Sequence, residues 1–350
     1  MVAFYAAHFG LIKFEQQGES VPEGAPRYWW KRLTPTFEFA AMHAILFQMA
    51  LIPLTMSRYS IAWLSRSECF IDKFVPLNRM LRIHIHLGYT MILIVFLAVI
   101  FFFTFFGLLC SDGDQSFCDK FKSEIMITGY VILVMLLIVG FTSFFRHKIP
   151  YEVFYVVHHI VFAMFILTIV HTIDVEQRKG LKERSQTFKW FSSTLLYYIA
   201  DRCYMHLTQR YKTKLLGSSV VYGEGGGTKM VILKIARPTL FHFKPGQYAF
   251  LRIPEIDAYH WHPFSIASGP ESSKLEFYIE VYGKNSWTGK LLKILNHDGA
   301  TNSGKLRLFV DVMGPYGTSL GKTDDYSHIM AIGAGTGTII VSLGHVRDCF

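Results

Sequence analysis

The sequence predicts a multi-pass α-helical membrane bundle, followed by an antiparallel β-barrel and by the first strand, turn and helix of an α/β domain. Three observations predict this fold class. Hydrophobic residues fill 51% of the 350 positions and charged residues only 17%, against about 25% in ordinary soluble domains. Long apolar segments lie before residue 201, and short segments rich in β-branched and aromatic residues follow it. A glycine-rich turn then stands between a buried strand and a helix.

The composition also narrows the class of protein. It excludes a disordered chain, a coiled coil and a typical cytosolic enzyme, because too many residues are apolar and too few are charged. The five cysteines include no CxxC pair, which excludes a disulfide-dense secreted scaffold and a zinc ribbon. The net charge of +9 carries little weight as a partner signal, because the loops that flank membrane spans also collect Lys and Arg. We expect membrane lipid, and not nucleic acid, as a partner.

A membrane span needs about 20 apolar residues. Three segments meet this need clearly, and a fourth is weaker because Glu38 lies near its start and Pro53 near its end. In chain order the four segments are 37–56, 87–109, 125–145 and 153–173. Residues 188–200 form either a last span completed by tilt or an interfacial segment. Residues 2–14 are too short to span and lack the features of a signal peptide.

The charges of the loops set the orientation of the bundle. Basic residues crowd the segment between the first two spans and the segment 145–150, which predicts that both are cytosolic. The loop 110–124 is acidic and is expected outside, as is 174–189, although basic residues slightly outnumber acidic ones there. Cys110 and Cys118 fall in the acidic outer loop, where disulfides persist. They form either a bridge or two free thiols.

Short segments separated by Gly and Pro turns indicate a small antiparallel barrel after residue 201. The candidate strands are 230–236, 248–253, 275–281 and 306–312. Residues 217–229, which contain GEGGGT, are expected to form a flexible link or a hairpin loop. The sequence contains no internal repeat and no low-complexity tract.

Histidines within the spans are the first candidate functional residues, because an imidazole is costly in hydrocarbon and therefore indicates function. The candidates are His84 and His86 at the cytosolic start of one span, and His158, His159 and His171 in another. Neutral imidazole is a common axial ligand of haem iron, so His84 with His158 would clamp one haem on the inner side. The alternative is that these histidines lie at the headgroup level or form hydrogen bonds within the bundle.

The spacing of His158 and His171 suits two haems stacked across the membrane. His171 follows His158 by 13 residues, which is a rise of about 20 Å in a helix. The same spacing turns the helix by about 140°. Either the helix is distorted, or the two sites are approached from different sides.

Residues 151–171 (YEVFYVVHHIVFAMFILTIVH) and 75–84 (VPLNRMLRIH) resemble two spans of the NADPH oxidase and ferric reductase superfamily. Its members have a transmembrane haem domain, a flavin barrel and a nicotinamide-binding domain. The resemblance runs from near residue 40 to the end of the chain. It implies a ferric-reductase-like haem domain with His84 on the inner haem, followed by a Greek-key β-barrel of the ferredoxin-reductase type that binds FAD.

The chain departs from the family at the outer haem. The family has a second histidine further along its third span, but the corresponding position is Ala98, or Ile100 when counted from His86. His171 therefore lacks the expected partner, and His43 is the nearby candidate. One haem and two haems remain as alternatives.

The segment 243–270 carries the most specific resemblance. It contains a PGQY turn and then the flavin motif of the family, at His262, Pro263, Phe264, Ser265, Ile266 and Ser268. A flavin ring packs on an aromatic face and needs a hydroxyl near its reactive edge, and proline fixes the backbone so that amides face the cofactor. The resemblance implies Phe264 and Ser265 at the isoalloxazine ring, with Ile266 and Ser268 towards the phosphates. The alternative is an ordinary strand and turn with a buried histidine.

A second flavin element departs from the family pattern. Glu280 stands where the family usually has an arginine that pairs with the pyrophosphate. A carboxylate cannot hold a phosphate by charge, so Lys284 and backbone amides are the candidates for this anchor. The resemblance still favours FAD over FMN.

The last segments resemble the start of a nicotinamide-binding domain. Residues 310–320 are similar to the turn that ends the family's barrel, and 328–343 fit a strand, a turn and a helix. The candidate NADPH-binding residues are Gly333, Gly335, Thr336 and Gly337, because glycines let backbone amides approach a pyrophosphate at a helix N-terminus. Such a domain needs several strand–helix units. The chain ends at Phe350 after one, so we expect a C-terminally truncated chain.

These features predict four regions, which are an N-terminal segment (1–36), a transmembrane haem domain (37–205), an FAD-binding β-barrel (206–325) and the start of an NADPH-binding domain (326–350). The expected protein is an NAD(P)H-dependent oxidoreductase of the plasma membrane. It would move electrons from cytosolic NADPH through FAD and haem b to exoplasmic oxygen or a ferric chelate, with membrane or cytosolic subunits as partners. The alternative is a catalytically incomplete membrane subunit that partners an intact reductase. The flavin motif disfavours a transporter or channel.

Overall fold

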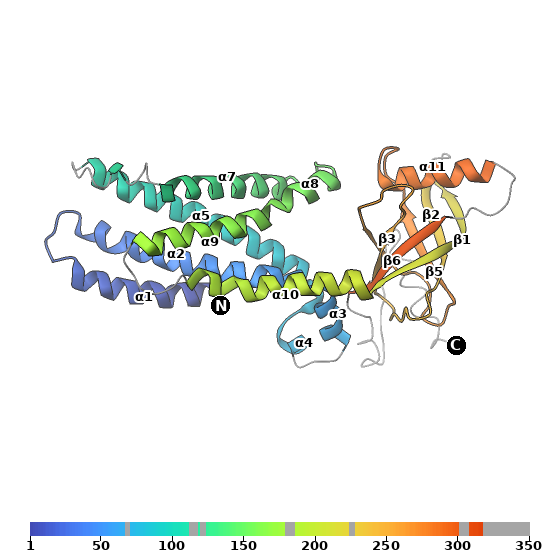
Figure 1. Ribbon diagram of the computed structural model, residues 1–350, viewed down its shortest axis with the longest axis horizontal. Helices are drawn as coiled ribbons and strands as arrows, with labels where there is room; N and C mark the ends of the chain where they lie inside the picture. The colour runs from blue at the N-terminus through green and yellow to red at the C-terminus, as the bar shows by residue number, and fades with distance from the viewer. Residues whose placement is uncertain are drawn as a thin grey trace. The chain divides into compact units, whose positions relative to one another are not determined.

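The structure, a computed structural model of the chain, describes residues 1–66, 71–111, 118–119, 124–178, 186–223, 228–300 and 308–317. The chain divides into two compact units. The first comprises Met1–Met56 and Met80–Tyr198, and the second comprises Ser57–Arg79 and Ile199–Phe350. The first unit is built of helices and the second around an antiparallel sheet (Figure 1), which confirms the predicted helical domain followed by a β domain. The glycine-rich unit predicted at 328–343 lies outside the described residues.

The helices of the first unit are long and apolar. They are α1 (Val2–Ser20), α2 (Tyr28–Thr55), α5 (Met80–Ser111), α7 (Glu124–Phe144), α8 (Tyr151–His158), α9 (Ile160–Arg178) and α10 (Gln186–Thr208), whose last residues belong to the second unit. Within the described ranges, four stretches have the length and apolarity of membrane spans: Tyr28–Thr55, Leu77–Ser111, Met126–Phe144 and Tyr151–His171. They confirm the four predicted spans, and the chain is a multi-pass membrane protein. The segment 188–200 lies in α10, outside these four.

Much of the apolar surface of these helices faces outward. Phe141 is 64% exposed and Val156 is 65% exposed. In water such exposure is unfavourable by about 25 cal/mol per Å² of apolar surface, whereas in a bilayer the same surface contacts lipid tails. A smaller internal cluster joins the helices and consists of Met49, Met91, Leu136, Met164, Phe165 and Phe191.

The fourth span is interrupted near its N-terminal end. α8 ends at His158 and α9 begins after His159, whose backbone N–H is shared between the carbonyls of Tyr155 (3.3 Å) and Val156 (3.2 Å). A shared bond of this kind is typical of a helix end. The helix is therefore distorted between His158 and His171, which is one of the two explanations that their spacing required.

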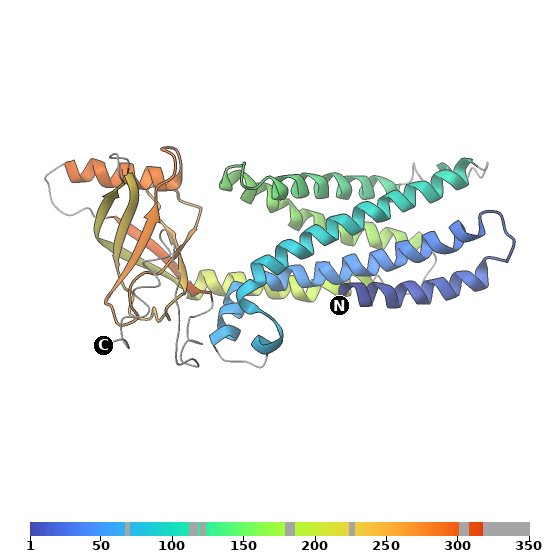
Figure 2. The same ribbon diagram turned by 180° about the vertical axis from the view of Figure 1, so that it is seen from behind.

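α1 and α2 pack as a helical hairpin and lie side by side in both views (Figures 1 and 2). Gly10 allows the close approach, because a Cβ atom added there would lie 3.2 Å from the Cβ of Ala40. α2 begins at Tyr28, earlier than the predicted span, and α1 extends beyond the apolar residues 2–14 that the sequence singled out.

The second unit is organised around one six-stranded sheet. Its strands are β1 (Arg210–Tyr222), β2 (Thr228–Ala236), β3 (Tyr248–Arg252), β4 (His262–Ser265), β5 (Lys274–Glu280) and β6 (Phe309–Tyr316). The order is β4-β3-β6-β1-β2-β5, and the neighbours pair antiparallel. Alternate side chains point into one core, as in β5, where Leu275, Phe277 and Ile279 are buried. The helix α11 (Trp287–Ala300) adds Trp287 and Leu291 to this core.

The predicted strands at 230–236, 248–253 and 275–281 coincide with β2, β3 and β5, whereas the one at 306–312 is shifted to β6. The segment 217–229 is part of a hairpin rather than a link, because β1 continues to Tyr222 and pairs with β2. β1 passes Gly217 through a register shift typical of a bulge. Ladder hydrogen bonds to β2 therefore override the loop propensity of the Gly and Ser residues there.

The second unit also contains the segment that links the first two spans. It folds into α3 (Arg58–Arg66), α4 (Ile71–Phe74) and the 3₁₀ helix η1 (Leu77–Arg79). Asp201 of α10 caps α3, because its carboxylate accepts the backbone N–H groups of Tyr59 (3.3 Å) and Ser60 (2.9 Å) and the Ser60 hydroxyl (2.6 Å). The helix then docks on the outer face of the sheet in a cluster formed by Ala62, Met205, Phe250, Met313 and Tyr316.

Candidate functional site

Two histidines from different helices face each other inside the first unit. His84 on α5 and His158 on α8 are half-buried, and their ring centroids lie 6.1 Å apart with an interplanar angle of 66°. Two imidazoles that bind one metal ion from opposite sides, through bonds of about 2 Å, have ring centres roughly 6 Å apart. The pair therefore has the separation of two axial ligands.

Hydroxyl groups of two further helices hold these rings. The Nδ1 atom of His84 lies 3.1 Å from Thr55 Oγ1 on α2, and that hydroxyl donates its own hydrogen to the carbonyl of Ile52 at 2.6 Å. Thr55 therefore accepts from the Nδ1–H of His84, which leaves Nε2 as the unprotonated nitrogen. His158 Nδ1 contacts the hydroxyl of Ser143 on α7 at 3.4 Å. A hydrogen bond of this kind at Nδ1 is typical of histidines that bind a metal through Nε2.

The neighbouring histidines point outward. His86 and His159 are exposed, and each donates Nδ1–H to the backbone carbonyl four residues earlier, at Arg82 (2.7 Å) and Tyr155 (2.6 Å). A carbonyl can only accept, so this assignment of the proton is fixed. The structure thus brings together one histidine of each predicted pair, His84 and His158, and holds the other two at the surface of the bundle.

The two candidates for an outer site lie in different surroundings. His171 on α9 has its Nδ1 atom 2.9 Å from the Thr128 hydroxyl on α7, against Gly129, where an added Cβ would lie 3.3 Å from His171 Cε1. His43 stacks on Phe9 of α1 at 3.9 Å and donates to the Phe39 carbonyl at 2.9 Å. His43 is therefore part of the α1–α2 hairpin contact.

The donor set fits a porphyrin better than a bare metal ion. Across the described ranges, the structure has no group of three or more His, Cys, Asp or Glu side chains that could hold a metal ion. A haem brings four nitrogen ligands of its own and needs at most two from the protein. The His84–His158 pair meets that need.

Cys110 and Cys118 are joined by a disulfide bond. The bond closes a loop of the chain that the sequence predicts to lie outside the membrane, where disulfides persist. The structure therefore contains the disulfide, and not two free thiols, at these positions.

In the second unit, the HPFS segment forms β4, and its aromatic residues gather around Trp287. The ring of Trp287 lies 4.7 Å from that of His262 and 5.5 Å from that of Phe264. Trp287 is 6% exposed, and its indole Nε1–H has no hydrogen-bond partner among the described residues. A buried donor without a partner is costly, so its position fits an acceptor supplied by a bound molecule.

The four motif residues divide between two faces of the strand. His262 and Phe264 point towards Trp287 and the core, whereas Pro263 and Ser265 are exposed on the opposite face. Phe264 and Ser265, which the resemblance implies at one flavin ring, therefore lie on opposite faces of β4. The two residues expected near the phosphates have other contacts: Ile266 is buried in the core, and the hydroxyl of Ser268 accepts the Glu276 N–H at 3.3 Å.

Trp287 is the first residue of α11, and the sequence motifs did not include it. A signal was present, because Ser286 precedes the apolar run and caps the helix by accepting the Gly289 N–H at 3.0 Å. The helix end packs tightly on the preceding turn, since a Cβ added at Gly289 would clash with the Gly283 carbonyl oxygen. An N-terminus of this kind favours an anion. The exposed side chain of Lys284 belongs to the same turn.

Glu280 is exposed at the end of β5 and accepts a hydrogen bond from the Tyr282 hydroxyl at 3.3 Å. Its negative charge raises the pKa of Tyr282. The carboxylate is thus engaged by a neighbour on its own chain, and the positive features near the start of α11 are the helix end and Lys284.

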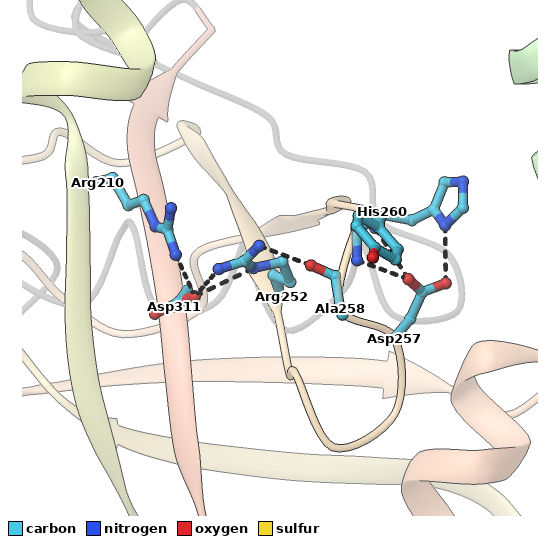
Figure 3. A network of polar contacts seen from close by, with 7 residues as sticks. Arg210, Arg252, Asp257, Ala258, His260 and Asp311 are labelled. Atoms are coloured by element: carbon cyan, nitrogen blue, oxygen red, sulfur yellow. Dashed lines mark hydrogen bonds and ion pairs between the residues drawn. The ribbon is translucent and has the colours of Figure 1, made fainter.

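A charged network lies at the other end of β3 (Figure 3). Arg252 and Arg210 share one oxygen of Asp311, with Nη2–Oδ2 distances of 2.5 and 3.0 Å, and the Asp311 side chain is only 4% exposed. Arg252 also donates to the carbonyl of Ala258 at 2.7 Å. The network therefore ties the loop before β4 to the centre of the sheet.

Asp257 holds that same loop (Figure 3). One carboxylate oxygen accepts the backbone N–H groups of Tyr259 (2.9 Å) and His260 (3.0 Å), and the other lies 2.8 Å from His260 Nδ1. Burial raises the pKa of Asp257, but these hydrogen bonds and the His260 side chain together lower it to about 2. The carboxylate is therefore ionised throughout the physiological range.

The glycine-rich NADPH candidates, Gly333, Gly335, Thr336 and Gly337, lie outside the described residues. Their role remains a prediction from the sequence.

Comparisons with known proteins match both units. Residues 61–169 match a family described as the ferric reductase like transmembrane component, and residues 217–320 match a family described as an FAD-binding domain. A superoxide-generating NADPH oxidase heavy chain of Dictyostelium discoideum is 27% identical over 89% of this chain and 48% of its own length. Respiratory burst oxidase homolog protein F of Arabidopsis thaliana is 25% identical over 85% of this chain and 35% of its own length.

A solved ferredoxin-NADP+ reductase from Plasmodium falciparum, 17% identical, aligns with 37% of this chain and 48% of its own chain, with a TM-score of 0.30. The chain spans about half or less of the length of the two curated relatives. The two family matches fall on the helical unit and on the sheet, in the order that the sequence motifs predict. Together, the two family matches and the curated relatives support the NADPH oxidase and ferric reductase superfamily for this chain.

Proposed function

We propose that the chain moves electrons across a membrane, from cytosolic NADPH through FAD and a b-type haem to an acceptor on the exoplasmic side. The observation that carries this proposal is the His84–His158 pair at 6.1 Å. The activity would be that of an NAD(P)H-dependent oxidoreductase. When bound, the flavin takes a pair of electrons as hydride and the haem iron carries them on singly, which is the chemistry that the protein itself lacks.

In the helical unit, His84 and His158 would hold the haem iron. Thr55 fixes the tautomer of His84 by accepting from its Nδ1–H, and Ser143 is placed to orient His158. Such partners keep the ring nitrogen that binds the metal unprotonated and correctly aimed.

In the sheet unit, residues at β4 and α11 would hold the flavin. His262, Phe264 and Trp287 provide aromatic surface, and the Trp287 indole provides a buried hydrogen-bond donor. The capped N-terminus of α11 and Lys284 offer positive potential for the phosphates in place of an arginine. These features support FAD, whose pyrophosphate needs such an anchor.

We propose dioxygen as the acceptor, which one electron reduces to superoxide. The names of the relatives, a superoxide-generating oxidase and a respiratory burst oxidase homolog, favour dioxygen over a chelated ferric ion. A ferric-chelate reductase would use the same conduit, so the acceptor is tested directly by comparing superoxide formation with ferric-chelate reduction by one preparation.

A second candidate function is that of a catalytically incomplete membrane subunit that assembles with an intact reductase. Two observations favour it. Glu280 stands where the family has a cation, and α5 has no histidine after His86 that could pair with His171. Each of these two departures would weaken one cofactor-binding site of the family while leaving the fold intact.

The two functions are separated by a reduced-minus-oxidised spectrum of the purified full chain, with haem and flavin quantified per polypeptide. The reductase predicts bis-histidine haem that dithionite reduces, together with bound FAD. When a nicotinamide-binding domain is present, NADPH should reduce the same haem. A preparation that binds neither haem nor FAD would overturn the reductase and leave the subunit.

A further inference from the structure

We propose that Gln247 is a positioning residue for the flavin, and that it fixes the end of the HPFS strand against the turn that follows β6. This inference rests on the proposed FAD site and adds a residue to it. The hydrogen bonds of Gln247 go to segments other than the aromatic group around Trp287. Its role would be to hold other segments in register.

Gln247 connects three separate motifs of the sheet unit. Its backbone carbonyl accepts the N–H of Ile266, the residue directly after β4, at 3.1 Å. Its side-chain Nε2 donates to the carbonyl of Gly317, directly after β6, at 3.0 Å. Its Oε1 accepts the N–H of Lys244 in the PGQY turn at 2.9 Å. The PGQY turn, the flavin motif and the GPYG turn (residues 314–317) thus meet at one residue, which bonds to the flavin motif through its backbone and to the two turns through its side chain.

The chemistry of this position calls for an amide. Gln247 is only 1% exposed, so both ends of its side chain need partners. One end must accept from a backbone N–H and the other must donate to a backbone carbonyl. An ionised glutamate could accept but not donate, and its negative charge would lie beside the Gly317 carbonyl oxygen. Loss of one buried partner is destabilising, because the other is left unsatisfied.

The segments that Gln247 joins are also packed closely to each other. Tyr248 is paired with Ser265 on β4 and with Tyr316 on β6. Gly317 has a φ of +85°, and a Cβ added there would lie 3.0 Å from the Tyr248 ring. The backbone after β6 therefore approaches β3 more closely than a side chain would allow. A shift of the Gly317 carbonyl would move this junction and the end of β4 together.

The expected consequence is weaker flavin binding without a change in the residues that contact the flavin. β4 carries His262 and Phe264, and its far end is fixed to β3 by the bond between Ile266 and Gln247. When the Gly317 bond is lost, that end has more freedom. Flavin binding must then also order this end of β4, and the entropy lost in doing so weakens the affinity.

The test compares Gln247→Glu and Gln247→Met with a matched control in the same sheet. Thr213→Val is the control, because the buried hydroxyl of Thr213 donates to the Ala236 carbonyl at 2.6 Å, a bond that involves none of the three motifs. The measurements on the purified full chain are the dissociation constant for FAD, the melting temperature without FAD, and the visible circular dichroism of the bound flavin.

We expect both Gln247 variants to raise the FAD dissociation constant about tenfold or more and to alter the flavin dichroism, with a loss of melting temperature no larger than that of Thr213→Val. Unchanged FAD affinity in both variants would overturn the proposal. Equal weakening of FAD binding in the Thr213→Val control would also overturn it, because the effect would then be general destabilisation. Failure of both Gln247 variants to fold would overturn it as well. Failure of the unsubstituted chain to bind FAD would instead refute the proposed FAD site.

Discussion

His84 and His158 lie on different helices and face each other with ring centroids 6.1 Å apart, whereas their neighbours His86 and His159 bond to carbonyls of their own helices at the surface of the bundle. The inward rings are oriented by hydroxyls of two further helices. Four helices therefore contribute to this one pair. Substitutions at these positions have different expected effects on haem binding, and the outward histidines serve as matched controls.

Thr55→Val should weaken haem binding without removing a ligand. The substitution keeps the shape of the side chain but removes the acceptor for His84 Nδ1–H, so the ring is free to rotate and change tautomer. Loss of such a partner lowers affinity for a bound metal about 10–100-fold. The measurement is the rate of haem transfer from the purified protein to apomyoglobin.

The control for this prediction is Thr104→Val on the same bundle. The Thr104 hydroxyl donates to the Ile100 carbonyl of its own helix, at 2.8 Å, and the residue is exposed. It should release haem at the rate of the unsubstituted protein. Equal rates for Thr55→Val and Thr104→Val would show that Thr55 does not orient the ligand.

Trp287→Phe should weaken FAD binding while preserving the aromatic contacts with His262 and Phe264. The ring remains, but the buried Nε1–H donor is lost. A hydrogen bond to a charged acceptor contributes about 1.5–3 kcal/mol, which corresponds to an increase of about 10–150-fold in the dissociation constant. Fluorescence titration with FAD measures it. Trp63→Phe on α3, where the tryptophan is 57% exposed, should have no effect on this titration.

Asp201→Asn should loosen α3 from the sheet unit. The carboxylate accepts three hydrogen bonds at the start of that helix, and removal of its charge weakens each of them. We expect a loss of about 1–3 kcal/mol in the local stability of α3. Hydrogen exchange at the amides of Tyr59 and Ser60 measures it. The control is Glu255→Gln, which changes an exposed carboxylate elsewhere. Amide exchange in Asp201→Asn that is as slow as in this control would contradict the capping role.

The lowered pKa of Asp257 predicts that the stability of the protein depends on this residue's protonation only at acidic pH. Its pKa is lowered from 3.8 to about 2 in the folded protein, so the folded state favours the ionised form. The stabilisation is fully present above the unfolded value and is lost as the pH falls from about 4 to about 2. Asp257→Asn should therefore be less stable than the unsubstituted protein by a constant amount between pH 5 and 8. In urea denaturation, the difference between the two should shrink as the pH falls from about 4 to about 2 and vanish below that. A difference that stays constant down to pH 2 would contradict the assignment.

The four spans could be predicted because length and apolarity alone identify them. The position of the histidines within those spans also predicted which residues to consider. Periodicity did not separate His84 from His86 or His158 from His159, because members of each pair are close in sequence and the choice depends on which neighbouring helices lie alongside. The distortion at His159 is likewise a property of packing and not of local sequence.

In the sheet unit, three strands followed from short segments rich in β-branched and aromatic residues, and the flavin motif followed from its resemblance to the family. The far end of the site could not be predicted. Trp287 follows the motif by many residues and meets His262 only because α11 folds back on β4. The role of Gln247 depends on the Gly317 carbonyl, a backbone atom that no side-chain pattern reveals. Contacts of this kind appear only when strands distant in sequence become neighbours.

Soret absorbance per polypeptide decides whether His84 and His158 together bind a haem. Four single alanine variants, at His84, His158, His86 and His159, are purified and reduced with dithionite under identical conditions. His84→Ala and His158→Ala should each lose half or more of the absorbance, since a bis-histidine site does not survive the loss of one ligand, while His86→Ala and His159→Ala should retain it. Full absorbance in His84→Ala and His158→Ala would contradict haem ligation by this pair.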